Sequence, residues 1–325
     1  MLKKFSFVDL EITFRFARDV AISAAGAGPM LRGAFGTQLR RIVCHDRRAD
    51  CRDCLMRQNC AYERLFSPMA APDAGRLRKE RDLPRPFIIK PPLKDGRYGQ
   101  DAAFTFRMIV VGDRVQWFPY IVVPFSELGR VGVGRERTPY TMERIVSRGI
   151  DAAAGREIYT AAENLVRVGD MVEISFADVT TAGREMRPER LSVTFLTPTI
   201  LRYNESGMPG GSRAMGVPEF HVLIKRLRDR VNRLALAYCG EELAVDHREF
   251  GQRAEAVERI AILGRWVERI RRTRTGQAQD LGGFVGRVSF AGQMEEFLPL
   301  LLLGQYVHVG KNSVFGGGWY EVGEE

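Results

Sequence analysis

The predicted strands and helices follow one order twice along the chain, and this repeat constrains the fold more than any other feature of the sequence. Apolar residues alternate in the predicted strands and recur every three or four residues in the predicted helices. The first half contains a strand at 5–16, a helix at 30–43 after a glycine-rich turn at 26–29, strands at 87–90 and 104–111, a helix at 116–128 and short strands to 176. Strand, helix, two strands, helix and strand is the order of a ferredoxin-like domain.

The second half repeats this order after a boundary predicted at 182–188. It contains a strand at 191–198, a basic helix at 217–238, a helix at 255–263, a hairpin of 266–275 with 281–290, a helix at 293–303 and a strand at 319–322. One continuous helix over 255–273 is the alternative for the middle of this half. The 325 residues suffice for two domains. We predict an α+β chain with two tandem ferredoxin-like (RRM-like) domains, residues 1–187 and 188–325.

The composition is that of a globular protein, with 45% hydrophobic and 27% charged residues. The longest apolar run, 297–303, contains Pro299 and is far shorter than the roughly 20 residues that cross a bilayer. The N-terminus includes Asp9 and Glu11, which a signal peptide's apolar region would exclude. These features predict a cytoplasmic protein.

Four of the five cysteines, Cys44, Cys51, Cys54 and Cys60, fall within 17 residues. Disulfides are rare in the cytosol, and the loop that carries these cysteines is too polar to form a core of its own. Four thiolates complete a tetrahedral zinc shell, so we predict a structural zinc knuckle at 44–60, inserted in the first domain. An iron–sulfur cluster uses the same ligands, and reduced thiols without a metal are the third alternative.

The net charge of +9 favours an anionic partner such as nucleic acid. Only seven of the 49 basic residues are lysine, so a preference for arginine in the source genome would also explain the composition. The placement of the charges is more informative, because they concentrate in the second half. We predict that a surface in this half attracts phosphate through Lys225, Arg226, Arg265, Arg269, Arg271, Arg272 and Arg274.

A glycine-rich loop at 304–318 lies between the predicted apolar helix and the last strand. Glycines let backbone N–H groups approach an anion, and the loop also carries polar side chains that contact or act on a phosphodiester. The predicted contacts are His308, Gly310, Lys311, Asn312, Ser313, Gly316, Gly317 and Gly318. The loop does not match a mononucleotide P-loop, in which Gly-Lys-Ser/Thr opens a helix after a strand, and this argues against ATP chemistry.

This arrangement resembles the CRISPR-associated endoribonucleases that process precursor crRNA, a branch of the RAMP superfamily. Their C-terminal loop has the pattern Gly-apolar-Gly, five residues, Gly-apolar-Gly. Here the pattern is 308–310, five residues and 316–318, so that His308 replaces the first glycine and Gly317 the second apolar residue. Segments 31–36, 62–66, 194–198 and 282–286 agree with the family in order and placement, and the resemblance covers nearly the whole chain.

The resemblance implies metal-independent cleavage of CRISPR repeat RNA to give guide RNA. In that chemistry the 2′-hydroxyl attacks the adjacent phosphate and leaves a 2′,3′-cyclic phosphate and a 5′-hydroxyl. A histidine moves the proton, and a cation such as Lys311 stabilises the phosphorane. His308 is the first candidate because it lies in the loop. His45 is the second, since many family members place their catalytic histidine near the end of the first helix.

The rival hypothesis is a RAMP-type subunit of a CRISPR effector complex that binds crRNA without cutting it. His308 and Lys311 favour catalysis, because binding alone would be served by arginine. A zinc-knuckle DNA-binding protein is disfavoured, because the knuckle at 44–60 lies far in sequence from the basic clusters.

Overall fold

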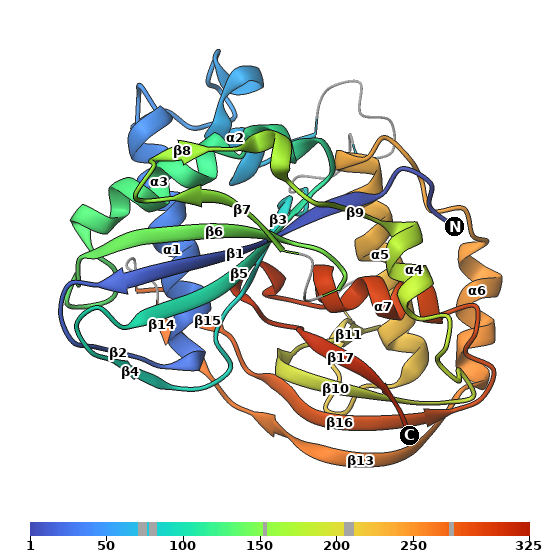
Figure 1. Cartoon of the computed structure of the whole chain (residues 1–325). Helices are drawn as coiled ribbons and strands as arrows, with labels where there is room; N and C mark the ends of the chain where they lie inside the picture. The colour runs from blue at the N-terminus through green and yellow to red at the C-terminus, as the bar shows by residue number, and fades with distance from the viewer. Residues whose placement is uncertain (71–76, 78–82, 152–154, 205–210, 273–275) are drawn as a thin grey trace. The chain divides into compact units, whose positions relative to one another are not determined.

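The computed structural model describes residues 1–70, 77, 83–151, 155–204, 211–272 and 276–325. Contacts between residues divide the chain into two compact units. The N-terminal unit comprises Lys4–Ser175 and Arg233–Glu241, and the C-terminal unit comprises Met1–Lys3, Phe176–Asn232 and Glu242–Glu325. Each unit combines helices with β-sheet, and every strand pair among the described residues is antiparallel (Figure 1). The predicted α+β class is therefore confirmed.

A seven-stranded sheet with its first strand near the centre builds the N-terminal unit. The elements of this unit are β1 (Ser6–Phe16), β2 (Val20–Ile22), α1 (Ala24–Val43), α2 (Ala61–Leu65), β3 (Phe87–Lys90), β4 (Gly96–Tyr98), β5 (Ala103–Val111), α3 (Pro119–Val131), β6 (Tyr140–Arg148), β7 (Gly155–Thr160), β8 (Leu165–Val166) and β9 (Glu173–Ser175). The strand order is β3-β5-β1-β6-β7-β8, and β9 pairs with the start of β1. β1 is almost entirely buried, and β5 and β6 pair with its two edges.

A four-stranded sheet builds the C-terminal unit. The elements of this half of the chain are α4 (Phe176–Ala182), β10 (Arg190–Thr199), β11 (Arg202–Tyr203), β12 (Arg213–Ala214), α5 (Phe220–Tyr238), α6 (His247–Arg253), β13 (Glu258–Val267), β14 (Ile270–Arg272), β15 (Ala278–Asp280), β16 (Gly283–Ala291), α7 (Leu298–Val307) and β17 (Tyr320–Glu324). The end of α5, from Arg233 on, falls in the N-terminal unit. The order of the sheet is β13-β16-β10-β17, and the separate pair β14-β15 extends the hairpin of β13 and β16.

The two units share one strand arrangement. In each, the first strand of the repeated set lies between the third and the fourth, and the second lies outside the third. In the N-terminal unit these strands are β1, β3, β5 and β6, and in the C-terminal unit they are β10, β13, β16 and β17. The repeat seen in the sequence is thus a repeat of topology.

The core of the N-terminal unit is rich in aromatic rings. Phe35 from α1 stacks on Phe125 from α3, with ring centroids 5.1 Å apart. Phe14 from β1 stacks on Tyr140 at 3.9 Å, and the Tyr140 hydroxyl donates to the Phe125 carbonyl at 2.7 Å. These contacts fix α1 and α3 relative to the sheet, and so they position the end of α1.

The predicted helix at 255–263 is wrong, as is the alternative helix over 255–273. Residues 258–267 form β13, which pairs along its length with β16. Helix propensity is a weak preference, and the ladder with β16 overrides it here. The predicted hairpin exists, but its first strand begins eight residues earlier than expected.

Two helices begin at other residues than the sequence predicted. α1 begins at Ala24, within the predicted glycine-rich turn, because the Ser23 side chain caps it by accepting from Gly26 N at 3.0 Å. α7 begins only at Leu298, because Pro299 lacks a backbone donor and is therefore best placed in the first helical turn. The other predicted helices, at 116–128 and 217–238, are confirmed as α3 and α5 with shifts of a few residues.

Among the helices in the described part of the chain, none is both long enough and apolar enough to span a membrane.

Two glycines of α1 predict opposite effects of the same substitution. A Cβ at Gly36 would overlap the Phe66 ring, whereas a Cβ at Gly33 would meet no atom within 4 Å. We expect Gly36→Ala to lower the free energy of unfolding by about 1–3 kcal/mol through overpacking. Gly33→Ala should raise it by about 0.5–1 kcal/mol through helix propensity. Denaturant titration of both variants checks this, and equal effects would contradict the packing of Phe66 on α1.

Candidate functional site

The cysteine loop, residues 44–60, follows α1 directly, and Arg40 in the last turn of the helix holds it. The Arg40 guanidinium donates to the carbonyl oxygen of Arg47 at 3.0 Å. It also lies over the ring of Tyr62 in α2, 5.7 Å from the centroid. A hydrogen bond with the Cys44 side chain raises the pKa of Arg40. Arg40 therefore joins the end of α1, the loop and α2.

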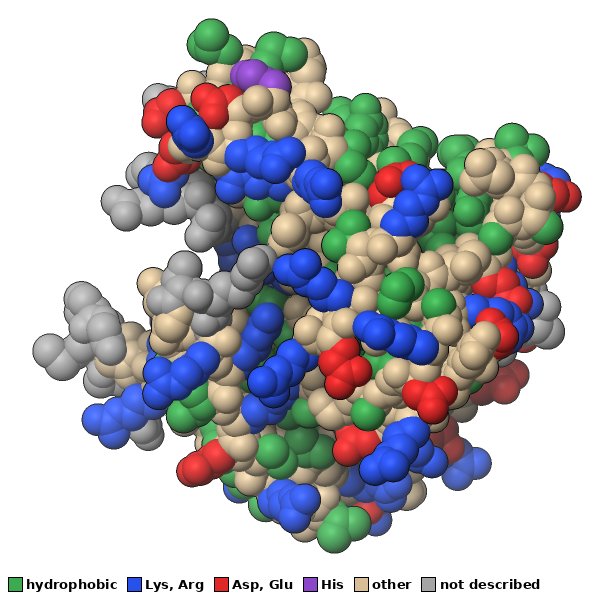
Figure 2. Space-filling view, turned by 90° about the vertical axis from the view of Figure 1, so that its left-hand side faces the viewer, with side chains coloured by type: hydrophobic (Ala, Val, Ile, Leu, Met, Phe, Trp, Pro, Cys, Tyr) green, Lys and Arg blue, Asp and Glu red, His purple; other side chains and the backbone are tan. Residues whose placement is uncertain are grey.

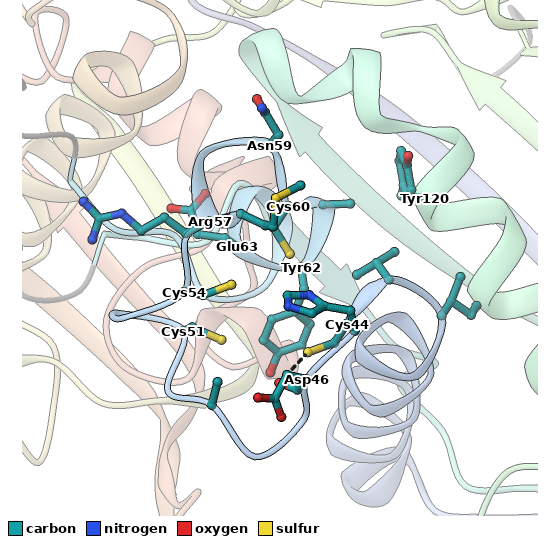
Figure 3. Close-up of a pocket in the computed structure, with 16 residues that line it drawn as sticks. Cys44, Asp46, Cys51, Cys54, Arg57, Asn59, Cys60, Tyr62, Glu63 and Tyr120 are labelled. Carbon is teal, nitrogen blue, oxygen red and sulfur yellow. Dashed lines mark hydrogen bonds between the residues drawn. The ribbon is translucent and has the colours of Figure 1, made fainter.

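The four clustered cysteines line one pocket of about 690 Å³. Figure 3 shows the sulfur atoms of Cys44, Cys51, Cys54 and Cys60 pointing into this pocket. Tyr120 from α3 lies on the side of the pocket opposite the cysteines. The structure thus brings together the residues that the sequence predicted as metal ligands.

Burial shifts the pKa values of several groups that line this pocket. It raises the pKa of the Cys51 thiol, and the nearby Arg40 guanidinium opposes that shift. Burial also raises the pKa of the Tyr62 hydroxyl and of the Glu63 carboxyl group. Partial burial disfavours the charged forms of these groups, and the Arg40 guanidinium partly offsets this effect for the Cys51 thiolate.

The fit of a metal to this pocket is incomplete. Among the described residues, no three His, Cys, Asp or Glu side chains are close enough together to hold a metal ion. The cysteines share a pocket without forming a coordination shell. The predicted zinc knuckle and the iron–sulfur alternative therefore stay predictions.

His45 lines the same pocket and is exposed. Its position follows from the end of α1 at Val43, since Cys44 already has extended backbone angles and the chain turns away from the helix axis. A side chain placed there can reach both solvent and the pocket. His45 is thus accessible from solvent at the edge of this pocket.

The glycine-rich loop packs its backbone against the end of β10. Lys311 N donates to the Ile200 carbonyl at 3.2 Å, and Gly318 N donates to the Pro198 carbonyl at 3.1 Å. Gly310 and Gly318 have φ of 77° and 71°, and a Cβ on either would overlap a backbone carbonyl. The glycines therefore serve close backbone packing. Because Lys311 N and Gly318 N already donate within the chain, a phosphate at the loop would contact other donors.

His308 lies inside the C-terminal unit and is fully buried. Its Nδ1 is 3.2 Å from the Gly317 carbonyl oxygen, and its ring stacks on Trp319 with the planes 6° apart. His308 ends α7 with φ of 60°, which turns the chain into the loop. In this conformation His308 does not meet an external phosphodiester. Lys311, three residues on, is exposed.

The glycine-rich loop contacts a hairpin that we call the arginine hairpin. We define it as β14 and β15 together with Arg265 and Arg269, which precede β14 in the chain. Asn312 Nδ2 donates to the Asp280 carbonyl at 3.0 Å, and Gln279 Nε2 donates to Asn312 Oδ1 at 3.5 Å. Gln279 is paired with Arg271 across the hairpin. The structure therefore unites the predicted loop and the predicted basic stretch in one surface. Ser313 is buried and donates to the Gly310 carbonyl, so it is not part of that surface.

The predicted basic residues differ in what surrounds them. Lys225 and Arg226 on α5 are paired with Glu255 at 2.6 Å and Asp229 at 3.7 Å. Among the basic residues on and beside the hairpin, Arg265 and Arg272 are exposed, and Arg269 and Arg271 are half-buried. Arg274 lies outside the described residues. Burial and the neighbouring Arg271 lower the pKa of Arg269. Figure 2 shows basic side chains, in blue, spread over one face, with acidic side chains, in red, among them.

Sequence reasoning missed Arg40 and Tyr62, which organise the cysteine loop. Cation–aromatic pairs between a helix and a following loop have no fixed spacing, so the sequence gives no signal for them. Asn312 was predicted as a phosphate ligand, whereas its side chain joins the loop to the hairpin.

Two family models match separate parts of this chain. Residues 5–171, just over half of the chain, match the AF_1859_N family, described as an N-terminal domain. Residues 193–320 match the family of the CRISPR-associated endoribonuclease Cas6. An uncharacterized protein of Archaeoglobus fulgidus is 25% identical over 302 residues, which cover 91% of each chain.

Solved structures are similar to this chain over its whole length. Thermus thermophilus Cas6 (TTHB231) aligns with a TM-score of 0.54 at 13% identity, covering 99% of this chain and 100% of the other. The Cas6 (TTHA0078) product complex aligns with a TM-score of 0.55 at 16% identity, covering 98% and 100%. At these identities the likeness concerns the fold. This chain therefore belongs to the family with an AF_1859_N-type N-terminal domain, and its residues 193–320 match the CRISPR-associated endoribonuclease Cas6 family.

Proposed function

We propose that this endoribonuclease cuts CRISPR repeat RNA in precursor crRNA and so releases guide RNA. The RNA supplies the nucleophile, since its 2′-hydroxyl attacks the adjacent phosphate and no metal-bound water takes part. The observation that carries the proposal is the docking of the glycine-rich loop on the arginine hairpin, within the residues that match Cas6. Two similar Cas6 structures are described as product complexes.

The RNA backbone contacts the arginine hairpin and the exposed Lys311. Asn312 joins the loop to the hairpin at Asp280, so Lys311 and Arg271 belong to one connected surface. Phosphates bind such a surface through arginine and lysine, which release counterions from the RNA. Lys311 is also the loop's candidate to stabilise charge on the phosphorane.

We assign the proton transfer to His45 in preference to His308. A general acid or base must come within hydrogen-bond reach of the proton that it moves. His45 is exposed beside a pocket, whereas His308 is buried between the Gly317 carbonyl and Trp319. This reverses the order that the sequence favoured.

The first test compares histidine variants in cleavage of repeat RNA. His45→Ala should slow cleavage by about 10²- to 10⁴-fold with RNA affinity almost unchanged, because it removes a proton carrier and no phosphate contact. Imidazole added to this variant should restore part of the rate. The exposed His247→Ala is the matched control and should cut normally.

The His308→Ala variant tests the alternative assignment, in which His308 is the catalytic histidine. It should lower the melting temperature, because it removes a buried ring from the core. If folded His308→Ala fails to cut while His45→Ala cuts normally, the catalytic histidine is in the loop. If the wild-type protein binds repeat RNA and never cuts it, the chain is a crRNA-binding subunit of an effector complex.

The second test concerns RNA affinity. Arg265→Ala, Arg271→Ala and Arg272→Ala should each weaken binding and lower the salt dependence of affinity by about one unit of slope. Arg253→Ala is the control, because the Arg253 guanidinium already pairs with Glu296 at 2.6 Å. Filter-binding titrations at several salt concentrations give the slopes. Unchanged slopes in all three hairpin variants would place the RNA elsewhere.

We further propose that the cysteine loop binds one structural zinc ion, for which the shared direction of the four thiols is the support. Deprotonated thiols are the zinc ligands. Burial raises the pKa of Cys51 and so disfavours that form, and Arg40 opposes this shift. Purified protein should contain about one zinc per chain, and Cys51→Ser with Cys54→Ser should lose it and melt earlier. Iron in place of zinc would indicate an iron–sulfur cluster. Metal-free protein with unchanged melting in the variant would refute a metal site.

The repeated topology also supports two ferredoxin-like domains, which we propose to be residues 1–187 and 188–325. In that arrangement, the cysteine loop is an insertion after the first helix of the first domain.

A further inference from the structure

The pocket beside His45 has an apolar side, distinct from the side that carries the cysteine thiols. Ile42 at the end of α1, Met56 in the cysteine loop and Tyr120 in α3 line it, and they are 41%, 58% and 41% exposed. Tyr120 lies opposite the cysteines (Figure 3), so this side is separate from the proposed zinc ligands. Exposed apolar side chains that line a hollow are typical of a binding site.

An aromatic pair lies at the start of α3. The ring centroids of Trp117 and Tyr120 are 5.5 Å apart, and Trp117 is half-buried. Trp117 therefore restrains the Tyr120 ring, which stays accessible from the pocket. Accessible aromatic rings of this kind stack on unpaired nucleobases, because every base has a flat face.

The charge around the pocket suits a polyanion. Residues 40–60 contain six arginines and three aspartates. Arg41 and Arg48 flank His45 in the sequence and are exposed, and neither is in an ion pair within the described part of the chain. Asp46, which also lines the pocket, accepts from the backbone N–H of Arg48 at 2.9 Å. Two arginine side chains are thus available to phosphates on either side of His45.

The place of His45 decides what enters this pocket. A proton carrier must come within hydrogen-bond reach of the reacting atoms, so the nucleotides next to the cut lie at His45. His45 lines the same pocket as the three apolar residues. A base next to the cut therefore meets an apolar hollow with an aromatic ring, while its phosphates meet Arg41 and Arg48.

We infer that the apolar side of this pocket binds one unstacked nucleobase next to the cleavage site, with Tyr120 as its stacking partner. The inference rests on the proposed cleavage of repeat RNA with His45 as the proton carrier. Tyr120 is then a positioning residue, because it holds the nucleotide at His45 without touching the reacting atoms. It follows that the RNA is unpaired at this nucleotide when it is bound, since a paired base stays in its helix.

Binding of repeat RNA that a single 2′-deoxy substitution has made uncleavable tests this inference apart from catalysis. Tyr120→Ala should raise the dissociation constant about 5- to 100-fold, because it removes a stacking contact. Tyr120→Phe keeps the ring and should bind like the wild type. The matched control is Val123→Ala, an exposed position one turn further along α3 and outside the pocket, which should also bind normally. Thermal melting verifies that each variant is folded.

Abasic substitutions, placed in turn at each nucleotide around the cut, identify the bound base. At one position the missing base should weaken binding to the wild type and have no further effect on Tyr120→Ala, because both changes remove the same contact. If the wild type binds and cuts the repeat while Tyr120→Ala binds it equally well, the inference is wrong and the proposed function stands. An equal loss of affinity in Val123→Ala would also overturn the inference. Wild-type protein that does not bind repeat RNA would refute the proposed function itself, and the inference with it.

Discussion

Gly310 and Gly318 allow the glycine-rich loop to pack its backbone against the carbonyl groups of its neighbours, and the C-terminal surface depends on this contact. Both residues have positive φ, and neither has room for a Cβ. The contact fixes Lys311 N on the Ile200 carbonyl, which leaves the Lys311 side chain exposed. Asn312, the next residue, then reaches the arginine hairpin. The close backbone packing at Gly310 and Gly318 thus determines where Lys311 and the arginine hairpin lie relative to each other.

The same packing explains why a residue within a glycine motif does not have to touch the ligand. His308 occupies the position where the family pattern has glycine, and its φ of 60° meets the same backbone requirement. Its ring fills the core against Trp319. His45 has the opposite setting, because it follows the end of α1 and faces solvent. We therefore propose that the C-terminal surface binds RNA phosphate and that His45, which follows the first helix, is the proton carrier.

Hydrophobic periodicity was sufficient to predict the repeated order of elements, including α3, α5 and the strand pairs that flank them. It failed at β13, where helix-forming residues are held in a strand by β16. It also could not show that His308 is buried, since burial depends on Trp319, eleven residues away in a loop. The clustering of the four cysteines predicted one shared site, and they do line one pocket. The role of Arg40 depends on three-dimensional contacts that carry no sequence pattern.

The central claim is that the RNA provides its own nucleophile, and product chemistry in EDTA tests it most directly. Wild-type protein and repeat RNA in EDTA should give one fragment with a 2′,3′-cyclic phosphate and one with a 5′-hydroxyl. A single 2′-deoxy substitution upstream of the cut should abolish cleavage while binding persists. Cleavage of that deoxy substrate, or products with a 5′-phosphate, would contradict the account.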